Sequence, residues 1–487
     1  MSARKSRKPR SKTASSQGRS RADRERSSPW PEELDLVVVH RLIGEIRETE
    51  HSSRIHSERQ FEVLMASIVR HGFTNPILVG PDDEIYAGSL RHRAAVRLGR
   101  KSVPVIRLGH QNRTQLRALR IADNRIAEHG AWDVPTLVRE IEELESLDEN
   151  FEIDDVGFST SELDSLIENF NEDLSDDPAD DAPAPDTANP PVTRLGDLFQ
   201  CGRHRILCAD ARDEGAYPVL LGDAVAELIF TDPPFNVRID GHASGLGRIR
   251  HREFAMASGE MTSDQFVGFL QTIIKNLIAV SADGSIHFIC HDWRHIGDLL
   301  RAAEPQYSEL KNVCVWAKTN GGMGSFYRSQ HELIFAFKNG TAPHINNFSL
   351  GQGGRYRTNV WSYAGANTFR RGREDDLAWH PTVKPVALVA DALKDCSRRN
   401  GVILDAFGCS GTTFMAAEKT RRRAHLLEID PVYVDVTVRR WEALTGQRAV
   451  HAETRLTFQE LALQRRSDAE EQPARARRRR RGGADGG

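Results

Sequence analysis

The apolar run that ends at Phe230 is followed, after one threonine, by four residues that could act together in catalysis: Asp232, Pro233, Pro234 and Phe235. Each proline fixes φ and lacks a backbone N–H, so the chain must leave the run in a stiff, extended turn. That turn presents a carboxylate, a free carbonyl and a flat ring at the carboxyl end of a predicted buried strand. Open α/β sheets bind their ligands at such ends.

The chemistry that suits this turn is attack by the exocyclic amine of an aromatic base. Asp232 and the Pro233 carbonyl would accept the two amine hydrogens and favour a pyramidal nitrogen, while Phe235 would stack on the base. A base reaches such a pocket only by leaving the duplex stack, a cost that stacking and edge hydrogen bonds offset. The competing interpretation is an ordinary strand-to-loop turn with a surface acid, so a second motif has to agree.

A second motif lies in residues 402–413, which read as an apolar strand, a glycine-containing turn and a helix start. Gly408 and Gly411 let the backbone approach a ligand closely, and the helix that begins near Thr412 directs its free N–H groups at that ligand. Glu428 ends the next apolar run, at a spacing that suits a carboxylate binding the two ribose hydroxyls of a nucleoside cofactor. The pattern is not G-x-G-x-x-G, so a dinucleotide is not indicated.

These two motifs, with residues 380–385 (His-Pro-Thr-Val-Lys-Pro) between them, resemble the amino-group DNA methyltransferases of the permuted (β) class. In that class the catalytic segment precedes the S-adenosylmethionine segment, and the resemblance spans residues 195–446. It implies that the turn at 232–235 is catalytic and that the site holds no metal. Cys409 stands where the family usually has a second glycine, and a small thiol should fit there. The cofactor contacts that the resemblance implies are Asp210, Thr382, Lys384, Asp405, Phe407, Gly408, Ser410, Gly411, Thr412 and Glu428.

The elements that must position these motifs follow from hydrophobic periodicity. Together with the resemblance they predict an α/β protein, with a doubly wound Rossmann-like methyltransferase domain after a smaller α/β domain with a helical extension. The predicted strands of the larger domain lie at 204–210, 228–230, 285–290, 312–316, 333–337, 402–404 and 426–429. Its predicted helices lie at 264–280 and 432–444, and begin near 386 and 412.

The smaller domain is predicted at residues 31–110, where its order of strands and helices resembles the ParB/sulfiredoxin-like N-terminal domain. In ParB proteins a glycine-acid-arginine-arginine turn binds a nucleoside triphosphate, but Ser89 and Leu90 replace the acid and the first arginine here. Gly88 with Arg91 and Arg93 near a helix N-terminus still predicts a nucleotide or phosphate ligand. An ordinary solvated arginine face is the alternative.

Composition divides the rest of the chain. Residues 111–170 read as three helices, either a helix-turn-helix-like DNA module or a plain helical bundle. Residues 171–194 are rich in Asp, Pro and Ala and predict an extended tether between domains. The methyltransferase domain is predicted at 195–455, between basic tails at 1–30 and 456–487. These tails either solubilise the chain or contact DNA phosphates, and they explain how a net charge of −3 can suit a DNA partner.

Two groups of basic and aromatic residues between the two motifs predict DNA contact, and the arginines of the second predict base recognition, because arginine reads guanine edges bidentately. One group lies in the loop 318–328, which is either a DNA-inserting loop or a mobile hairpin. The other lies at 346–375, where the permuted class has its target-recognition segment. The predicted DNA-binding residues are Arg328, Arg355, Arg357, Arg370 and Arg371.

The composition excludes a membrane protein, since no run of about eighteen apolar residues occurs. Six scattered cysteines without C-x-x-C pairs indicate reduced thiols and a cytoplasmic location. The predicted partner is double-stranded DNA, and a homodimer is one possible assembly. An acid before Pro-Pro favours adenine in this family, so the predicted function is site-specific adenine-N6 methylation, as in restriction-modification. The alternatives are cytosine-N4 methylation, or a non-catalytic ParB-like DNA-binding protein with an idle methyltransferase fold.

Overall fold

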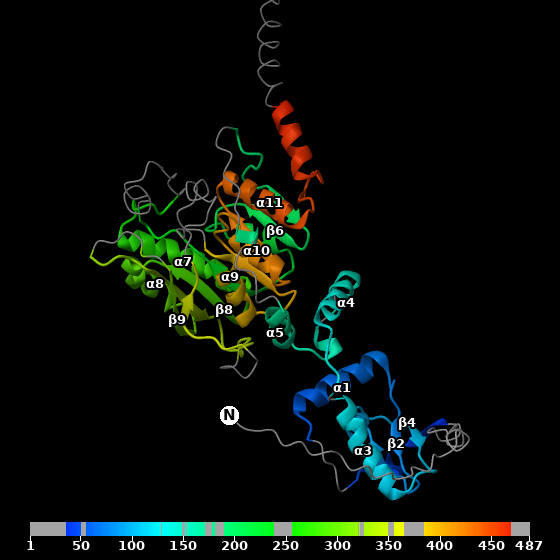
Figure 1. The fold of residues 1–487 in the computed structure, drawn as a ribbon. Coiled ribbons are helices and arrows are strands. Elements are labelled where there is room, and N and C mark those ends of the chain that lie inside the picture. The colour runs from blue at the N-terminus through cyan, green and yellow to red at the C-terminus, as the bar shows by residue number, and fades with distance from the viewer. Residues whose placement is uncertain are drawn as a thin grey trace, which may run out of the picture. The chain divides into compact units, whose positions relative to one another are not determined.

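The chain folds into two compact units that divide between Trp132 and Asp133. Figure 1 labels α1, α3, β2 and β4 in the first unit and β6, β8 and β9 in the second. The computed structural model describes residues 36–49, 55–127, 129–148, 151, 153–170, 178–180, 189–237, 256–319, 321, 326–348, 355–364 and 384–468. The predicted tail at 1–30 lies outside these ranges. Among the described residues, no helix has the length and hydropathy that crossing a membrane requires.

The first unit is a small α/β domain. Its described residues form a four-stranded sheet in the order β1-β4-β2-β3, with β2 parallel to β4 and the two other pairs antiparallel. The strands are β1 (Val38–Leu42), β2 (Ile77–Val79), β3 (Ile85–Ala87) and β4 (Ser102–Arg107), and the helices are α1 (Glu58–His71), α2 (Ser89–Arg97) and α3 (Arg113–Ala127).

Local signals explain how α1 is bounded and buried. The Ser57 side chain accepts a hydrogen bond from the Gln60 backbone N–H at the start of α1, and the chain turns away at Gly72, where φ is 78°. Phe61 and Ile68, seven residues apart on one face of α1, are buried and pack against Leu90 and Ala94 of α2. The ParB-like order of elements is therefore present.

The second unit is built on a mixed sheet. Within the described residues its ten strands lie in the order β11-β9-β10-β8-β7-β12-β13-β6-β5-β14. The five central strands from β8 to β6 run parallel to one another. The strands are β5 (Leu198–Cys201), β6 (His204–Cys208), β7 (Ala226–Thr231), β8 (Ser281–His291), β9 (Glu309–Ala317), β10 (His331–Lys338), β11 (Val360–Ser362), β12 (Val402–Asp405), β13 (Arg423–Glu428) and β14 (Val450–His451).

Helices cover both faces of this sheet, as the doubly wound prediction requires. Two separate apolar cores lie on the two faces, one reaching the helices α9, α10 and α11 and the other α6, α7 and α8. The helices are α6 (Ala216–Leu221), α7 (Ser263–Ala279), α8 (Ile296–Ala303), α9 (Val386–Cys396), α10 (Thr412–Lys419) and α11 (Pro431–Thr445). This arrangement brings the carboxyl ends of β7 and β12 side by side.

Three predicted boundaries differ from the structure. The helices α4 (Val134–Leu147) and α5 (Thr160–Phe170) belong to the second unit. Part of the predicted tether is docked, because Ala179 is 1% exposed and its carbonyl accepts a hydrogen bond from Arg440. The core also extends past residue 455, since Phe458 and Leu461 are buried in it.

Candidate active site

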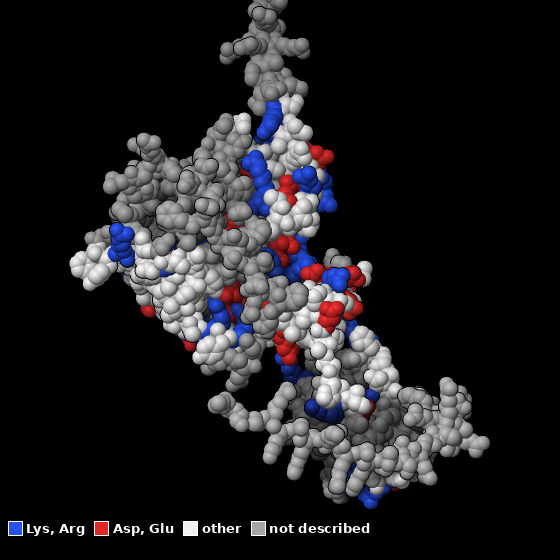
Figure 2. All heavy atoms as spheres, in the orientation of Figure 1, with Lys and Arg blue, Asp and Glu red and all other residues white. Residues whose placement is uncertain are grey.

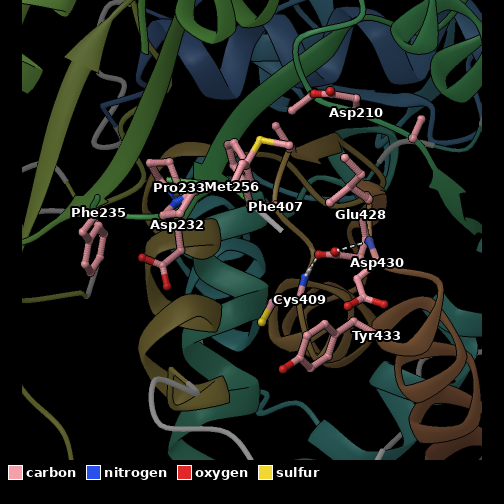
Figure 3. Close-up of a pocket in the computed structure, with 15 residues that line it drawn as sticks. Asp210, Asp232, Pro233, Phe235, Met256, Phe407, Cys409, Glu428, Asp430 and Tyr433 are labelled. Carbon is pink, nitrogen blue, oxygen red and sulfur yellow. Dashed lines mark hydrogen bonds between the residues drawn. The ribbon is translucent and has the colours of Figure 1, made fainter. Parts of the chain in front are cut away.

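A cleft of about 850 Å³, part of it open to solvent, lies at the carboxyl ends of the central parallel strands (Figure 3). The turn at 232–235 after β7, which we predict to be catalytic and call the catalytic turn, forms one side of it, and the turns after β12 and β13 form the other. The two predicted motifs therefore share one cleft. It is lined by Ala209, Asp210, Ala211, Asp232, Pro233, Pro234, Phe235, Met256, Ala406, Phe407, Cys409, Glu428, Ile429, Asp430 and Tyr433.

The two carboxylate oxygens of Asp232 have different surroundings. Oδ2 accepts a hydrogen bond from Nζ of Lys384 at 2.5 Å. Oδ1 is buried and accepts no hydrogen bond from any described residue. A buried acceptor without a donor is costly, so a donor from a bound molecule would satisfy it. The structure thus leaves the acceptor that an exocyclic amine needs.

Lys384 lies at the centre of a buried charge cluster beside the catalytic turn. Its ammonium is also 3.0 Å from Oε2 of Glu332 on β10. The other carboxylate oxygen of Glu332, Oε1, pairs with Lys318. The rings of Phe235 and Trp316 lie 5.8 and 5.9 Å from the same Nζ. Such ring contacts favour a cation in a buried site.

The cluster shifts the pKa values of its members. Burial raises the pKa of Asp232 above its usual range, while the Lys384 ammonium opposes that shift. Burial would also raise the pKa of Glu332, but the ammonium groups of Lys384 and Lys318 lower it to about 2. Burial would lower the pKa of Lys384, yet the carboxylates of Asp232 and Glu332 raise it well above its usual value. Lys384 therefore favours the ionised form of Asp232 against the effect of burial.

Lys384 was predicted to contact the cofactor, and the geometry does not support that role. It is 4% exposed, its ammonium contacts Asp232 and Glu332, and it is absent from the residues that line the cleft. The other predicted contact in this segment, Thr382, lies outside the described residues. Lys384, which precedes α9, therefore contacts the turn at 232–235 through its ammonium.

Asp405 at the end of β12 joins the two halves of the site. Its Oδ1 accepts hydrogen bonds from the Thr231 hydroxyl and the Phe407 N–H, each at 3.0 Å, and its Oδ2 accepts one from Thr413 at 2.7 Å. Burial raises the pKa of Asp405 to about 7, against these hydrogen bonds. Asp405 thus ties β7 to the glycine-containing turn and does not line the cleft.

Glu428 ends β13 and faces the cleft, where Figure 3 shows both of its hydrogen bonds. Oε2 accepts from the Cys409 N–H at 2.7 Å and Oε1 from the Asp430 N–H at 2.8 Å. Burial raises the pKa of Glu428 to about 7. A carboxylate has about four lone-pair positions, so each oxygen keeps capacity for a ligand hydroxyl. The two oxygens therefore offer neighbouring acceptors at the cleft.

The glycine-containing turn depends on a close approach of backbone to helix. Gly411 has φ of 81°, and a Cβ added to it would lie 2.6 Å from the Thr437 side chain on α11. A Cβ on Gly408 would lie 3.0 Å from Leu426. Cys409 adopts φ of 46°, the left-handed region that favours glycine. The thiol therefore occupies a position where the backbone suits the glycine of the resembled family.

The remaining predicted cofactor residues divide into two groups. Asp210 and Phe407 line the cleft, and Asp210 forms an ion pair with Arg212 at 2.6 Å. Ser410 and Thr412 are 4% and 9% exposed and belong to the turn and its helix start. Sequence reasoning missed Met256 and Tyr433, which also line the cleft. Tyr433 lies one turn into α11, and only its spacing after Glu428 could have indicated it.

Arg355 and Arg357 were predicted to read bases, but the structure places them in an internal ion-pair cluster. Arg355 is 5% exposed and lies 3.1 Å from Asp395, and Arg357 lies 3.0 Å from the same carboxylate. Arg357 also lies 3.1 Å from Asp391. The geometry therefore argues against base reading by these two residues.

The other predicted DNA contacts have a different outcome. Arg328 is exposed, next to Phe326 and Tyr327, which are 88% and 81% exposed. Arg370 and Arg371 lie outside the described residues. Among the described residues no group of three or more His, Cys, Asp and Glu side chains could hold a metal ion.

In the first unit, Gly88 has φ of 99° at the start of α2, as a strand-to-helix turn requires. Arg91 donates a hydrogen bond to the Asn75 carbonyl at 3.0 Å. Arg93 lies over the Phe61 ring at 5.5 Å. Both guanidinium groups therefore have partners inside the unit, and a nucleotide or phosphate ligand there stays a prediction.

Three family models match the chain in succession. A ParB N-terminal domain model matches residues 36–124, a ParB-methyltransferase HTH domain model matches residues 135–195, and a DNA methylase model for N6 and N4 methyltransferases matches residues 226–439. Together they place the two predicted resemblances in the predicted order.

Similar proteins cover the two parts separately. The type II methyltransferase M2.MboI of Moraxella bovis is 23% identical over 237 residues, which cover 46% of this chain and 83% of that protein. The ParB-like nuclease domain-containing protein YnaK of Escherichia coli is 42% identical over 71 residues, or 15% of this chain and 82% of YnaK. The solved M1.HpyAVI–SAM complex is 18% identical with a TM-score of 0.36, and the match covers 48% of this chain and 97% of that one.

Proposed function

Because this chain joins a ParB N-terminal domain and a ParB-methyltransferase HTH domain to a methylase domain of the N6/N4 amino DNA methyltransferase family, we propose that it methylates adenine N6 in double-stranded DNA. The methyl donor is S-adenosylmethionine, and the adenine is flipped out of the duplex. The acid at position 232 supports adenine over cytosine. The similarity to type II methyltransferases supports action at a specific site.

The single observation that carries the proposal is the cleft shared by Asp232 and Glu428. The vacant Oδ1 of Asp232 suits an amine hydrogen at one side, and the Glu428 carboxylate suits a ribose diol at the other. The close packing at Gly411 lets the turn backbone reach a nucleoside between them. The residues present therefore fit S-adenosylmethionine, which when bound supplies an electrophilic methyl carbon on its sulfonium.

The residues of the chain act by orienting the base. Asp232 and the Pro233 carbonyl accept the two amine hydrogens, which directs the nitrogen lone pair away from them. Phe235 stacks on the base, and Lys384 holds Asp232 ionised and in place at 2.5 Å. Fixing both reactants in one cleft supplies much of the rate enhancement, since oriented reactants avoid the entropy cost of a bimolecular encounter. The proton that leaves the methylated amine is accepted by Asp232 or by water.

The experiment that tests this function is nucleoside analysis after incubation of the full chain with duplex plasmid DNA and S-adenosylmethionine. Digestion to nucleosides and mass spectrometry should find N6-methyladenine. If only N4-methylcytosine is found, the substrate base is cytosine and not adenine. If neither base appears although calorimetry shows that S-adenosylmethionine binds, the protein is a DNA-binding protein with an idle methyltransferase fold.

A further inference from the structure

The helical module at residues 133–170 is strongly acidic. By sequence it carries 13 Asp and Glu residues and one basic residue, Arg139, so its net charge is 1 − 13 = −12. Figure 2 shows acidic side chains gathered over α4. Nucleic-acid-binding elements present Lys and Arg to the phosphates, because release of condensed counterions drives the association. A module of this charge repels a DNA backbone.

The acids of this module have a basic partner in the same chain. Asp164 of α5 is 4% exposed and lies 2.9 Å from Nη2 of Arg422 and 3.4 Å from Nη1 of Arg399. Glu145 of α4 lies 3.3 Å from Nε of Arg399. Arg422 is 0% exposed. Two guanidinium groups of the methyltransferase are therefore compensated by carboxylates of the module.

Further pairs extend this contact along the same edge. Glu168 of α5 lies 2.5 Å from Nη1 of Arg355 and also pairs with Lys394 of α9. Glu142 of α4 pairs with Arg421. The acids thus meet five cations of the methyltransferase, namely Arg355, Lys394, Arg399, Arg421 and Arg422.

The contact lies at the opposite end of the sheet from the cleft. Arg399 precedes β12, which begins at Val402, and Arg422 directly precedes β13, which begins at Arg423. These are the amino ends of the strands whose carboxyl ends form the cleft. The module is therefore placed away from the site that a flipped base must enter.

The apolar core of the module is its own. Leu137, Ile141, Phe151, Ile153 and Leu163 form a cluster that is separate from the two cores of the methyltransferase sheet. The described contacts between module and methyltransferase side chains are mainly ion pairs. Buried ion pairs form only when each carboxylate meets its guanidinium, so they favour one orientation of the module on the sheet.

We propose that residues 133–170, which the ParB-methyltransferase HTH model largely covers, are an acidic brace for the methyltransferase and not a DNA-binding element. The partner of this surface is the arginine-lined amino end of β12 and β13 in the same chain. The brace compensates buried guanidinium groups that would otherwise destabilise the sheet. It differs from both predictions for this region, a DNA module and a plain linker bundle.

The DNA part of this proposal is tested with Arg139→Ala in the full chain, since Arg139 is the one basic residue of the module by sequence. The affinity for a fluorescein-labelled duplex of mixed sequence is measured by anisotropy. The brace predicts that Kd changes by less than about twofold. A loss of about tenfold or more would mean that the module contacts phosphates and would overturn the proposal.

The structural part is tested by the melting temperature, which does not depend on methyl transfer or on DNA. Asp164→Asn keeps the side-chain size but leaves the guanidinium groups of Arg399 and Arg422 without their shared carboxylate. It should lower Tm by roughly 5 °C or more. The matched control Glu140→Gln, at an exposed position on α4, should shift Tm by less than about 1 °C.

A milder variant covers the case in which Asp164→Asn does not fold. Glu145→Gln removes the ion pair with Arg399 and leaves Asp164 in place. It should give a smaller drop in Tm together with faster hydrogen exchange at the amino ends of β12 and β13. Unchanged Tm and unchanged exchange in Glu145→Gln, or in a folded Asp164→Asn, would overturn the brace.

Discussion

Nζ of Lys384 lies 2.5 Å from Oδ2 of Asp232, so one oxygen of this carboxylate is held by a cation while Oδ1 accepts no hydrogen bond from a described residue. Lys384 is in turn held by Glu332 at 3.0 Å. The carboxylate therefore has a fixed charge and a fixed orientation before any base enters. Preorganisation of this kind lowers the cost of reaching the reactive geometry.

Replacing Lys384 by methionine should reduce methyl transfer by roughly 100-fold or more, because burial raises the pKa of Asp232 and the nearest ammonium then no longer opposes that shift. A protonated Asp232 carboxyl donates a hydrogen bond and is a poor acceptor for the amine N–H. The affinity for S-adenosylmethionine should change by less than about threefold, since Lys384 does not line the cleft. Radiolabelled methyl transfer and calorimetry measure the two quantities.

The matched control for that variant is Lys311→Met, which removes a lysine paired with Glu309 at a half-exposed surface position. It should leave both quantities unchanged. A Lys384→Met protein that loses cofactor affinity and activity in the same proportion would instead support the predicted cofactor contact.

Replacing Glu428 by glutamine should weaken binding of S-adenosylmethionine by roughly 10- to 100-fold, because hydrogen bonds to a charged acceptor are stronger than those to a neutral one. The variant also tests the raised pKa of Glu428, which is about 7 in the folded protein. A glutamate in the unfolded chain titrates near its usual ~4.3. Between these values the folded state binds more protons, so stability falls as the pH rises through about 7.

Glu428→Gln should therefore reduce the loss of stability between pH 6 and pH 8, as measured by urea unfolding. The other groups that titrate in this range are common to both proteins and cancel in the comparison. Equal slopes for variant and wild type would contradict the raised pKa.

The glycine-containing turn offers two substitutions with opposite expected effects. Gly411→Ala places a methyl group 2.6 Å from Thr437 at a φ of 81°, so it should destabilise the protein by about 2 kcal/mol or more. Cys409→Gly removes a side chain from a residue at φ of 46° and should stabilise the protein, or be neutral, within about 1 kcal/mol. Urea unfolding measures both, and the reverse order would contradict the turn geometry.

Arg355 and Arg328 should separate stability from DNA binding. Arg355→Ala removes the buried guanidinium that Asp395 and Glu168 share, and it should lower stability by about 3 kcal/mol. Arg328→Ala, at an exposed position, should leave Tm unchanged and weaken duplex binding by a factor of about 3 to 10. Loss of DNA affinity in Arg355→Ala at unchanged Tm would restore the predicted base-reading role.

Much of the site followed from the sequence because its parts are local motifs at strand ends. Each motif is only a few residues long and predicts a function by itself. One is the acid, two prolines and ring after β7, and the other is the pair of glycines after β12. Parallel strands then bring such turns to one edge of the sheet. The shared cleft of Asp232 and Glu428 was predicted for this reason.

The features that were not predicted depend on pairings between distant segments. Glu332 reaches Lys384 because β10 inserts antiparallel between β8 and β9. Arg355 is buried because acids of α5 and α9 converge on it. No local pattern distinguishes an arginine that meets a distant carboxylate from one that meets DNA, so composition alone favoured the wrong partner.

The central claim is that Asp232 holds a flipped base amine in the cleft that also binds the methyl donor. It is tested most directly by mass spectrometry of nucleosides from duplex DNA treated with wild-type protein or with Asp232→Ala. Calorimetry measures the binding of S-adenosylmethionine to both proteins. The wild type should produce N6-methyladenine, and the variant should produce none while its cofactor affinity stays within about threefold. Equal amounts of methylated base from both proteins, or loss of cofactor binding in the variant, would contradict the account.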